Sequence, residues 1–247
     1  MSLPQEQKTA RNLRNSPRRL LRGESISDYA IRDVLMRHEE FLSGTVLDLG
    51  CGSRPYEHCF NGRVTRWVGA DYPASGHPPA TRVEVFADAM KLPLADQSFD
   101  CVLCTQVLEH VPEPLDLLCE SWRVLRQGGH LVLTAPQYNG LHGEPQDFFR
   151  YTKYGLEHLA RKAGFAVKRI VPIGGFISLF TFQTTIHCAP LRLWPISGLW
   201  QWAGWKLDGK FPRPRDCMGY LLIAERPSER LACAKRPASD GPVSSSC

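Results

Sequence analysis

The stretch VLDLGCGSRP, residues 46–55, decides the fold of this chain. A strand-like run, Val46 to Leu49, ends at Gly50, and Gly52 follows shortly after it. Glycines in such a turn let a ligand approach the main chain closely, because they tolerate left-handed backbone conformations. The pattern predicts a buried strand that runs into a ligand-binding turn, with a helix after it.

Strand and helix patterns alternate along the rest of the chain. Helices are predicted at 27–42, from Pro114 to the Gly128–Gly129 pair, and from a Thr152 cap to Gly164. Strands are predicted at 45–50, 66–71, 82–88, 99–105, 130–136, 165–171 and 217–225. Strands that alternate with helices indicate an α/β fold built on a parallel sheet.

The basic excess of the chain lies in its two ends. The 247 residues carry a net charge of +5, yet residues 1–23 alone carry +5 and residues 226–247 carry +2. We therefore expect a basic, flexible tail at 1–23, one folded domain at 24–226 and a disordered tail at 227–247. A nucleic-acid-binding domain usually concentrates basic residues on its folded surface, so nucleic acid is not the expected partner.

An apolar segment at about 172–210 interrupts the alternation. No Lys, Arg, Asp or Glu occurs between Arg169 and Arg192, and four tryptophans follow, at 194, 200, 202 and 205. Its prolines and glycines argue against a membrane span and favour an inserted cap. The tryptophans could form the core of this cap, a substrate or dimer surface, or an anchor in a membrane interface.

Nine scattered cysteines indicate structural thiols in a reducing, cytoplasmic compartment. Cys101 and Cys104 form a CxxC pair, but they lie within a predicted buried strand. No second pair follows at metal-binding spacing, and the first residues lack the apolar core of a secretory signal. We expect neither a metal site nor export.

Asp71 indicates the class of cofactor. It stands at the end of the second predicted strand, 21 residues after Gly50, where an acidic residue can bind a pair of ribose hydroxyls. The sixth position from Gly50 is Pro55, not the glycine of a dinucleotide-binding turn. A nucleoside without a pyrophosphate, such as S-adenosyl-L-methionine (SAM), therefore fits better than NAD, which remains the alternative.

In these motifs the chain resembles the class I, Rossmann-like SAM-dependent methyltransferases, and among them the type 11 methyltransferase-domain group. The resemblance covers about 45–171 and rests on VLDLGCG, VGADY, FADAMKLPLADQSFDCVLCTQVLEHVPEP and RVLRQGGHLVLTAP. It implies a three-layer, doubly wound seven-stranded sheet with strand order 3-2-1-4-5-7-6 and an antiparallel last strand.

The same resemblance implies a set of cofactor contacts. Gly50 and Gly52 would pass under the methionine part of SAM, and Asp48 would orient that loop and the ammonium group. Asp71 would bind the ribose hydroxyls, with Tyr72 against the adenine. The remaining contacts would come from Asp88 and the backbone of Ala89 at the adenine, and from Gln106 at the methionine end. Arg54 stands where many members carry a third glycine.

Two segments offer candidate catalytic and substrate-binding residues. His110 follows the fourth strand, on the side where ligands bind, and could act as a general base or belong to the scaffold. A polar loop after the fifth strand, 142–152, is similar to a stretch in methyltransferases of bacterial surface-glycan and natural-product gene neighbourhoods. His142, also a catalytic candidate, Asp147, Arg150 and Tyr151 could bind substrate there, or an Asp147–Arg150 pair could simply hold the loop.

These observations predict an enzyme that transfers a methyl group from SAM to a small-molecule, glycan or lipid-linked acceptor, with oxygen as the expected acceptor atom. S-adenosyl-L-homocysteine would be the product. The alternatives are methylation of RNA or protein, and a SAM-binding module without activity. Peripheral membrane contact is expected from the apolar segment and the basic tail. The sequence does not identify the acceptor atom and leaves the oligomeric state open.

Overall fold

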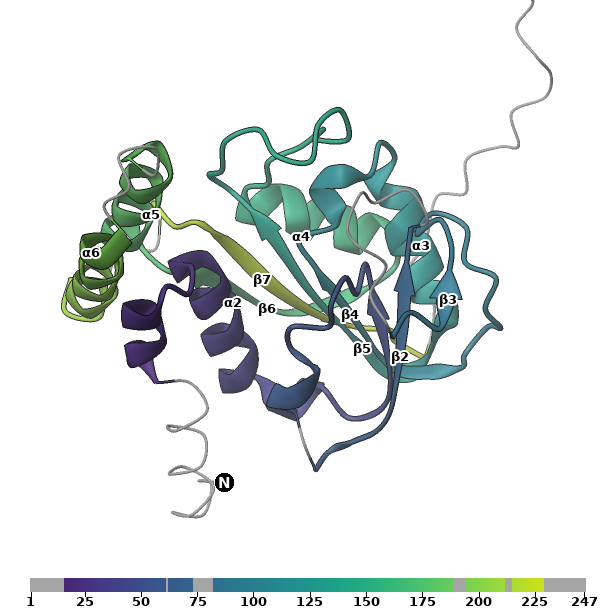
Figure 1. The fold of residues 1–247 in the computed structure, drawn as a ribbon. Coiled ribbons are helices and arrows are strands. Elements are labelled where there is room, and N and C mark those ends of the chain that lie inside the picture. Colours follow the sequence, from purple (N-terminus) through teal and green to yellow (C-terminus); the bar gives the residue numbers. More distant parts are fainter. Residues whose placement is uncertain (1–15, 61, 73–81, 189–193, 212–214, 229–247) are drawn as a thin grey trace, which may run out of the picture.

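A seven-stranded mixed sheet forms the centre of the protein (Figure 1). The computed structural model describes residues 16–60, 62–72, 82–188, 194–211 and 215–228. The sheet order is β3-β2-β1-β4-β5-β7-β6. Its strands are β1 (Gly44–Leu49), β2 (Val64–Asp71), β3 (Val85–Phe86), β4 (Phe99–Thr105), β5 (Leu125–Pro136), β6 (Ala166–Ile173) and β7 (Gly219–Glu225).

The strand directions confirm the predicted class I methyltransferase fold. Strands β1 to β5 pair in parallel, whereas β7 runs antiparallel to both β5 and β6. The strand order reverses at β1, which lies between β2 and β4. Such a reversal leaves a crevice at the carboxyl ends of the strands, where open α/β sheets bind their ligands.

Helices cover both faces of the sheet, which gives the predicted three layers. Helices α3 (Pro114–Val124) and α4 (Lys153–Lys162) pack on one face. Helices α2 (Ile26–Arg37), α5 (Phe176–Cys188) and α6 (Trp194–Asp208) pack on the other. Thr152 caps α4 as predicted, since its Oγ1 accepts a hydrogen bond from the Gly155 N–H at 3.1 Å.

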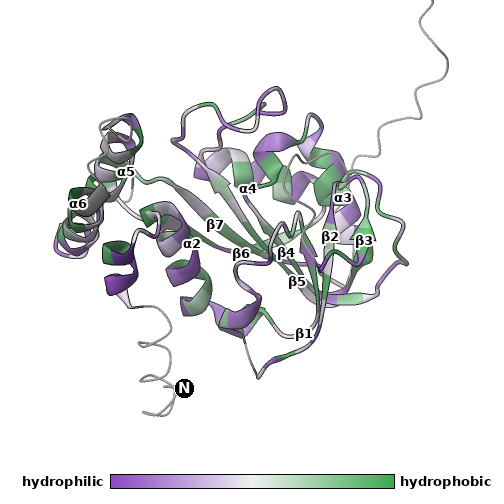
Figure 2. Cartoon of the chain, in the orientation of Figure 1, coloured by the Kyte–Doolittle hydropathy of each residue, from purple (hydrophilic) through white to green (hydrophobic). Residues whose placement is uncertain are grey.

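The central strands are apolar on both faces, as strands of a buried parallel sheet should be (Figure 2). Successive residues therefore contribute to opposite cores: Val102 faces α3 and α4, whereas Leu103 faces α2. Cys101 and Cys104 are buried, as predicted, and free. They point to opposite faces of β4, belong to different cores and do not form a pair.

Several predicted elements differ from the structure. The helix expected at 27–42 ends at Arg37, the helix from Pro114 ends at Val124 because β5 begins there, and the strand expected at 82–88 is limited to β3. No α-helix follows the glycine turn; the connection to β2 contains only the 3-10 turn η3 (Glu57–Cys59) among the described residues. The connection is short, and the glycine turn takes up its first part. Tyr56 and Phe60 pack the remaining part into the core beside α2. The expected N-terminal tail is also shorter, because η1 (Pro17–Arg22) is folded and its Leu20 is fully buried. Residues 1–15 and 229–247 of the two expected tails lie outside the described residues.

The apolar insertion forms a pair of helices, α5 and α6, at one end of the molecule (Figure 1). Helix α6 packs on η1 and α2: the Tyr29 and Trp205 rings meet edge to face at 4.9 Å, and the Gln201 Oε1 accepts from the Ile26 N–H at 2.7 Å. Trp202 and Trp205 thus belong to the core, while Trp200 is 43% exposed. Among the described helices, none is both long and apolar enough to cross a membrane.

Candidate active site

The turn after β1 has the open backbone that the sequence predicted. Gly50 and Gly52 both have positive φ angles, 71° and 47°. A Cβ on Gly50 would lie 2.3 Å from Cγ2 of Val107, whereas a Cβ on Gly52 would meet no heavy atom within 4 Å. Gly50 therefore packs tightly against the segment after β4. Gly52 faces open space, which is available to a ligand.

Asp71 closes this turn from the end of β2. Its Oδ2 accepts a hydrogen bond from the Gly52 N–H at 2.8 Å, and its Oδ1 accepts from the Tyr72 N–H at 2.7 Å. A carboxylate offers about four acceptor positions, so room remains for two further donors. The spacing along the chain thus places the predicted ribose-binding carboxylate directly against the turn. Tyr72 beside it is 53% exposed.

Arg54 has a role that the sequence did not reveal. It has a φ of 55°, the left-handed conformation that a glycine would adopt easily. Its guanidinium is buried, passes over Gly69 of β2 and forms an ion pair with Glu84. Glu84 Oε2 also accepts from the Gly69 N–H at 2.6 Å. Arg54 therefore replaces the missing third glycine and ties the turn to the edge of the sheet.

Asp48 is buried under the same turn. Its side chain is 2% exposed, and its Oδ2 accepts a hydrogen bond from the Trp67 Nε1–H at 3.1 Å. Burial raises the pKa of Asp48 to about 7, against the opposing effects of the Trp67 hydrogen bond and of Arg54. A cationic group at this place would favour the ionised form.

The other predicted cofactor residues line the same edge of the sheet. Asp88 forms a turn in which its Oδ1 accepts from the Met90 N–H at 2.8 Å, and Ala89 is half-buried beside it. Gln106 has a φ of 54°, unusual for a residue that is not glycine, and its N–H donates to the Thr134 carbonyl at 3.0 Å. Strained residues of this kind concentrate at functional sites.

Comparison with known proteins identifies the family. Residues 47–133 match a family model described as a methyltransferase domain. An uncharacterized methyltransferase of Mycolicibacterium paratuberculosis is 33% identical over 169 residues, which are 63% of this chain and 66% of that protein. The chain thus carries a methyltransferase domain, on a fold that it shares with SAM-dependent methyltransferases. The matched regions span 32% to 66% of the first curated relatives' lengths.

Solved structures share the fold of this chain. A SAM-dependent methyltransferase from Archaeoglobus fulgidus has a TM-score of 0.56 and 19% identity, over 81% of this chain and 94% of that one. The [4+2]-cyclase SpnF has a TM-score of 0.54 and 23% identity, over 81% of each chain. The fold thus occurs in proteins named for different reactions, and the acceptor side of this chain must be judged from its own residues.

The loop after β5 is held by its own charged residues. Arg150 Nη1 lies 2.6 Å from Asp147 Oδ1, and Arg150 Nη2 donates to the Gly140 carbonyl at 2.7 Å. The Arg150 hydrogen bonds hold the pKa of Asp147 well below its usual range. The Tyr151 hydroxyl donates to the Leu108 carbonyl at 3.0 Å. The Asp147–Arg150 pair therefore helps to hold the loop, and Tyr151 ties it to the segment after β4, while substrate binding by these residues stays a prediction.

The two candidate catalytic histidines, far apart in sequence, lie together in space. The rings of His110 and His142 meet edge to face with centroids 4.8 Å apart. Each Nε2 is 3.9 Å from Oε1 of Glu109, whose side chain is fully buried. The Glu109 carboxylate raises the pKa of His142. Only the fold could show this grouping, because His142 comes from a different loop.

A small, open pocket lies beside Gln106. Two of its residues, Tyr138 and Asn139, come from the loop after β5, and Phe182 comes from the inserted helix α5. The lining combines polar and apolar groups and also includes Ser27, Ile31, Pro136, Ile173, Met218 and Gly219. The insertion thus contributes to a pocket that adjoins the predicted methionine end of the cofactor site.

Proposed function

We propose that this chain transfers a methyl group from SAM to an oxygen of a small-molecule, glycan or lipid-linked acceptor, releasing S-adenosyl-L-homocysteine. The observation that carries the proposal is the open Gly52 turn, closed by Asp71 and adjoining the Gln106 pocket. SAM supplies an electrophilic methyl group when bound. The protein contributes mainly alignment and exclusion of water.

In this proposal the turn and the strand ends bind the cofactor. Asp71 accepts hydrogen bonds from the ribose hydroxyls while it keeps its contact with Gly52. Asp48 faces the ammonium group, and Gly50 lets the methionine part lie close to the main chain. Tyr72, Asp88 and Ala89 form the adenine side, and Gln106 forms the side nearest the acceptor.

The pocket beside Gln106 supports an acceptor with an apolar portion. Phe182, Ile31 and Met218 form an apolar wall, while Tyr138 and Asn139 offer polar groups at its rim. Apolar pockets with a few polar groups bind the body of a ligand by burial and fix its orientation by hydrogen bonds. We assign activation of an acceptor hydroxyl to His110 and His142, both partly exposed near this pocket.

The exposed face of the helix pair supports peripheral contact with a membrane on the cytoplasmic side. Phe180 and Trp200, whose rings are 6.2 Å apart, are 50% and 43% exposed. The adjoining η1 exposes Arg18, Arg22 and the apolar Leu21. An apolar face flanked by cations suits an anionic lipid surface, and a lipid-linked acceptor would be presented there.

A labelled-methyl transfer assay tests the proposed function. The protein is incubated with methyl-labelled SAM and separate lipid, glycan, small-molecule, RNA and protein fractions of a cell extract, with Asp71→Ala as control. We expect label in one of the first three fractions for the wild type only. Label in RNA or protein would support the alternative substrates instead. SAM binding without any transfer would identify a non-catalytic module.

A further inference from the structure

Glu109 is a buried acid whose carboxylate faces the rings of His110 and His142. Its side chain is 0% exposed, and neither carboxylate oxygen forms a hydrogen bond within the described part of the chain. Its backbone is well fixed, because the Glu109 carbonyl accepts from the Phe148 N–H at 2.8 Å. A buried carboxylate is costly unless a positive charge or hydrogen-bond donors compensate it, so something should bind to these oxygens.

The two neighbouring histidines direct their Nε2 atoms toward that carboxylate. His110 Nδ1 lies 2.5 Å from the Gln146 carbonyl oxygen, and His142 Nδ1 lies 3.0 Å from the Gly140 carbonyl oxygen. Carbonyl oxygens only accept, so these contacts favour a proton on each Nδ1, and in the neutral form of the ring Nε2 then carries the lone pair that a metal needs. Arg150 and Asn139 lie farther from His142 Nδ1, at 3.4 Å, and Arg150 already donates to Gly140 and Asp147.

Three potential metal-ligand atoms therefore converge, one from each of these residues. Both Nε2 atoms are 3.9 Å from Glu109 Oε1, and the three atoms lie within 4.8 Å of one another. Ligands of a tetrahedral zinc ion bind at about 2.0–2.2 Å, hence about 3.3 Å from each other. The two histidines are 26% and 34% exposed, so side-chain rotations can close the remaining distances of at most about 1.5 Å.

We propose that Glu109, His110 and His142 bind one divalent cation of borderline softness, with Zn²⁺ as the representative. Two imidazoles and one carboxylate are a donor set of catalytic zinc sites, which keep a fourth position open. Histidine ligands of metals typically donate their other ring N–H to a backbone carbonyl or a carboxylate, as both histidines do here. No metal-binding spacing is visible in the sequence, because His142 reaches the site only through the loop after β5.

This inference rests on the proposed function and extends it to the acceptor. Asn139 lines the acceptor pocket and also lies 3.4 Å from His142, so the cation site and the pocket are neighbours. A hydroxyl oxygen in the open position would lose its proton to solvent more readily. The oxygen–methyl bond then forms as the sulfonium carbon–sulfur bond breaks. The structure thus favours an acceptor whose hydroxyl can coordinate a metal.

Metal binding is tested on the full chain without a polyhistidine tag, with its cysteines kept reduced. Co²⁺ is titrated while its visible absorption bands are recorded, and Zn²⁺ is then added in competition. We expect one equivalent of Co²⁺ to give bands typical of nitrogen and oxygen ligands, and Zn²⁺ to remove them. His142→Gln and Glu109→Gln should weaken binding by at least ~100-fold, since even the loss of an indirect partner costs about 10–100-fold.

His158→Gln is the matched control, because His158 is exposed on α4 and should leave binding unchanged. SAM affinity, measured on each variant by calorimetry, shows that the fold is intact and tests the cofactor site separately. Absence of a Co²⁺ signal in a protein that binds SAM would overturn the metal site alone, and would indicate that a protonated histidine compensates Glu109. Equal metal binding by His142→Gln and wild type would also overturn it.

Discussion

Asp71 combines two tasks in one side chain: it fixes the Gly52 turn and has acceptor positions left for a ribose. Hydrogen bonds to a charged group contribute roughly 1.5–3 kcal/mol each. We expect Asp71→Ala to weaken SAM binding by about 10–100-fold, measured by calorimetry. Asp96→Asn is the control, since Asp96 is 70% exposed in an ion pair with Arg123. Unchanged affinity in Asp71→Ala would remove the residue from the cofactor site.

Asp48 should make stability depend on pH. Its pKa of about 7 in the folded protein exceeds the value near 4 of an unfolded chain, so the folded state retains the proton more strongly. The stabilising effect of that proton is complete below pH ~4 and is lost as the pH rises toward 7. The free energy of unfolding should therefore fall by about 2–4 kcal/mol over this range relative to Asp48→Asn.

Chemical denaturation of both proteins at several pH values checks this expectation. If the free energy of unfolding changed with pH in the same way for the wild type and for Asp48→Asn, the expectation would be contradicted. Saturating SAM should reduce the difference if its ammonium group faces the Asp48 carboxylate, because the cation then favours the ionised acid.

At the scale of single residues, the sequence was informative where spacing alone determines position. Gly50 and Asp71 lie at the ends of neighbouring parallel strands, so their separation predicts that they meet. Arg54 and Glu109 were missed as functional residues because their partners, Glu84 and His142, come from distant segments of the chain. A charged residue in a glycine position was the one available signal for Arg54.

At the scale of elements, the turn after β1 depends on its fit against the segment after β4. Gly50→Ala should lower the free energy of unfolding by about 2–4 kcal/mol, because a left-handed φ and a contact with Val107 both oppose the new Cβ. Gly52→Ala meets open space and should cost only about 1 kcal/mol.

Urea denaturation of the single and double variants separates the two causes. Val107→Ala removes the colliding methyl groups, so the double variant should recover at least about 1 kcal/mol relative to the sum of the single effects. If the two changes in the free energy of unfolding simply added, backbone strain alone, and not the contact with Val107, would explain the cost of Gly50→Ala.

One carboxylate, at the end of α6, links helices α5 and α6 by hydrogen bonds. Asp208 Oδ2 accepts from the N–H groups of Gly175 and Ser178 at 2.9 and 2.8 Å, and its Oδ1 accepts from Ile177 at 3.0 Å. These are the unpaired donors at the start of α5, so Asp208 caps a helix from a distant position.

Asp208→Ala should destabilise the helix pair by about 2–3 kcal/mol, since three charge-assisted hydrogen bonds are lost. Hydrogen exchange within 176–188 should accelerate, while SAM affinity stays unchanged because the turn after β1 is remote from the pair. Glu157→Ala, which breaks an exposed ion pair with Arg161 on α4, should cost about 0.3–0.5 kcal/mol. Slow exchange in both variants would show that the cap is dispensable.

The sequence predicted the strands better than the connections between them. A strand such as Phe99–Thr105 is recognisable because its buried side chains are uniformly apolar. The connection from β1 to β2 was expected to contain a helix, yet tertiary packing of Tyr56 and Phe60 determines its path. Likewise, η1 reads as part of a polar tail, and only its contact with α6 explains why Leu20 is buried.

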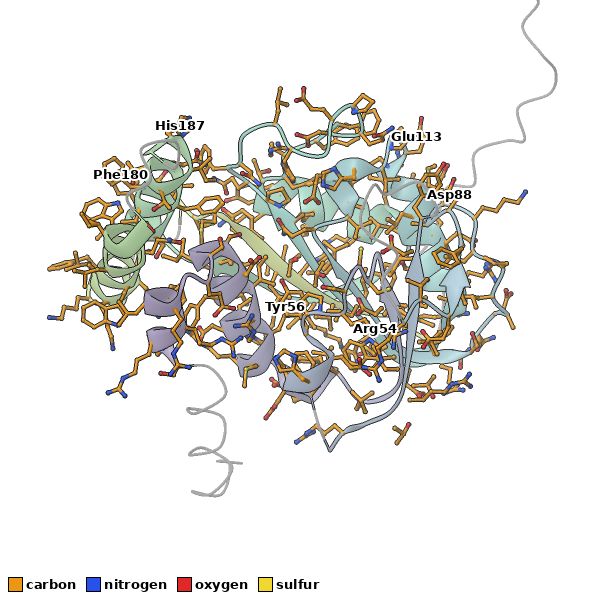
Figure 3. All side chains as sticks on the ribbon, viewed as in Figure 1. Arg54, Tyr56, Asp88, Glu113, Phe180 and His187 are labelled. Carbon is orange, nitrogen blue, oxygen red and sulfur yellow. The ribbon has the colours of Figure 1, made fainter. Side chains whose placement is uncertain are left out.

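At the scale of the whole molecule, cofactor and surface functions are separated along the sheet. Arg54 and Asp88 lie in the part that carries β1 to β3, whereas Phe180 and His187 lie on α5 at the opposite end (Figure 3). The acceptor pocket lies between them, since it combines Gln106 with Phe182. In the proposed function, an acceptor would enter from the side of the helix pair while SAM binds at the turn.

The exposed face of the helix pair should bind anionic membranes. Ile196, Leu199 and Trp200 of α6 are 62%, 54% and 43% exposed. Exposed apolar side chains that lie side by side are unfavourable in water and often mark an interaction surface. We expect the protein to sediment with vesicles that contain anionic lipid at low salt. Binding should weaken at high salt, because attraction between the arginines of η1 and the lipid surface is screened.

Matched variants distinguish a lipid-binding face from ordinary core. Replacing Leu199 and Trp200 by Ser should abolish sedimentation and leave folding intact, since neither side chain belongs to the core that includes Trp202 and Trp205. Trp205→Ala should instead destabilise the protein, because Trp205 packs on Tyr29. Recovery of the wild type entirely in the supernatant at low salt would exclude the membrane surface. The exposed face would then have to be covered by a second copy of the chain or by another protein, which the oligomeric state in solution would reveal.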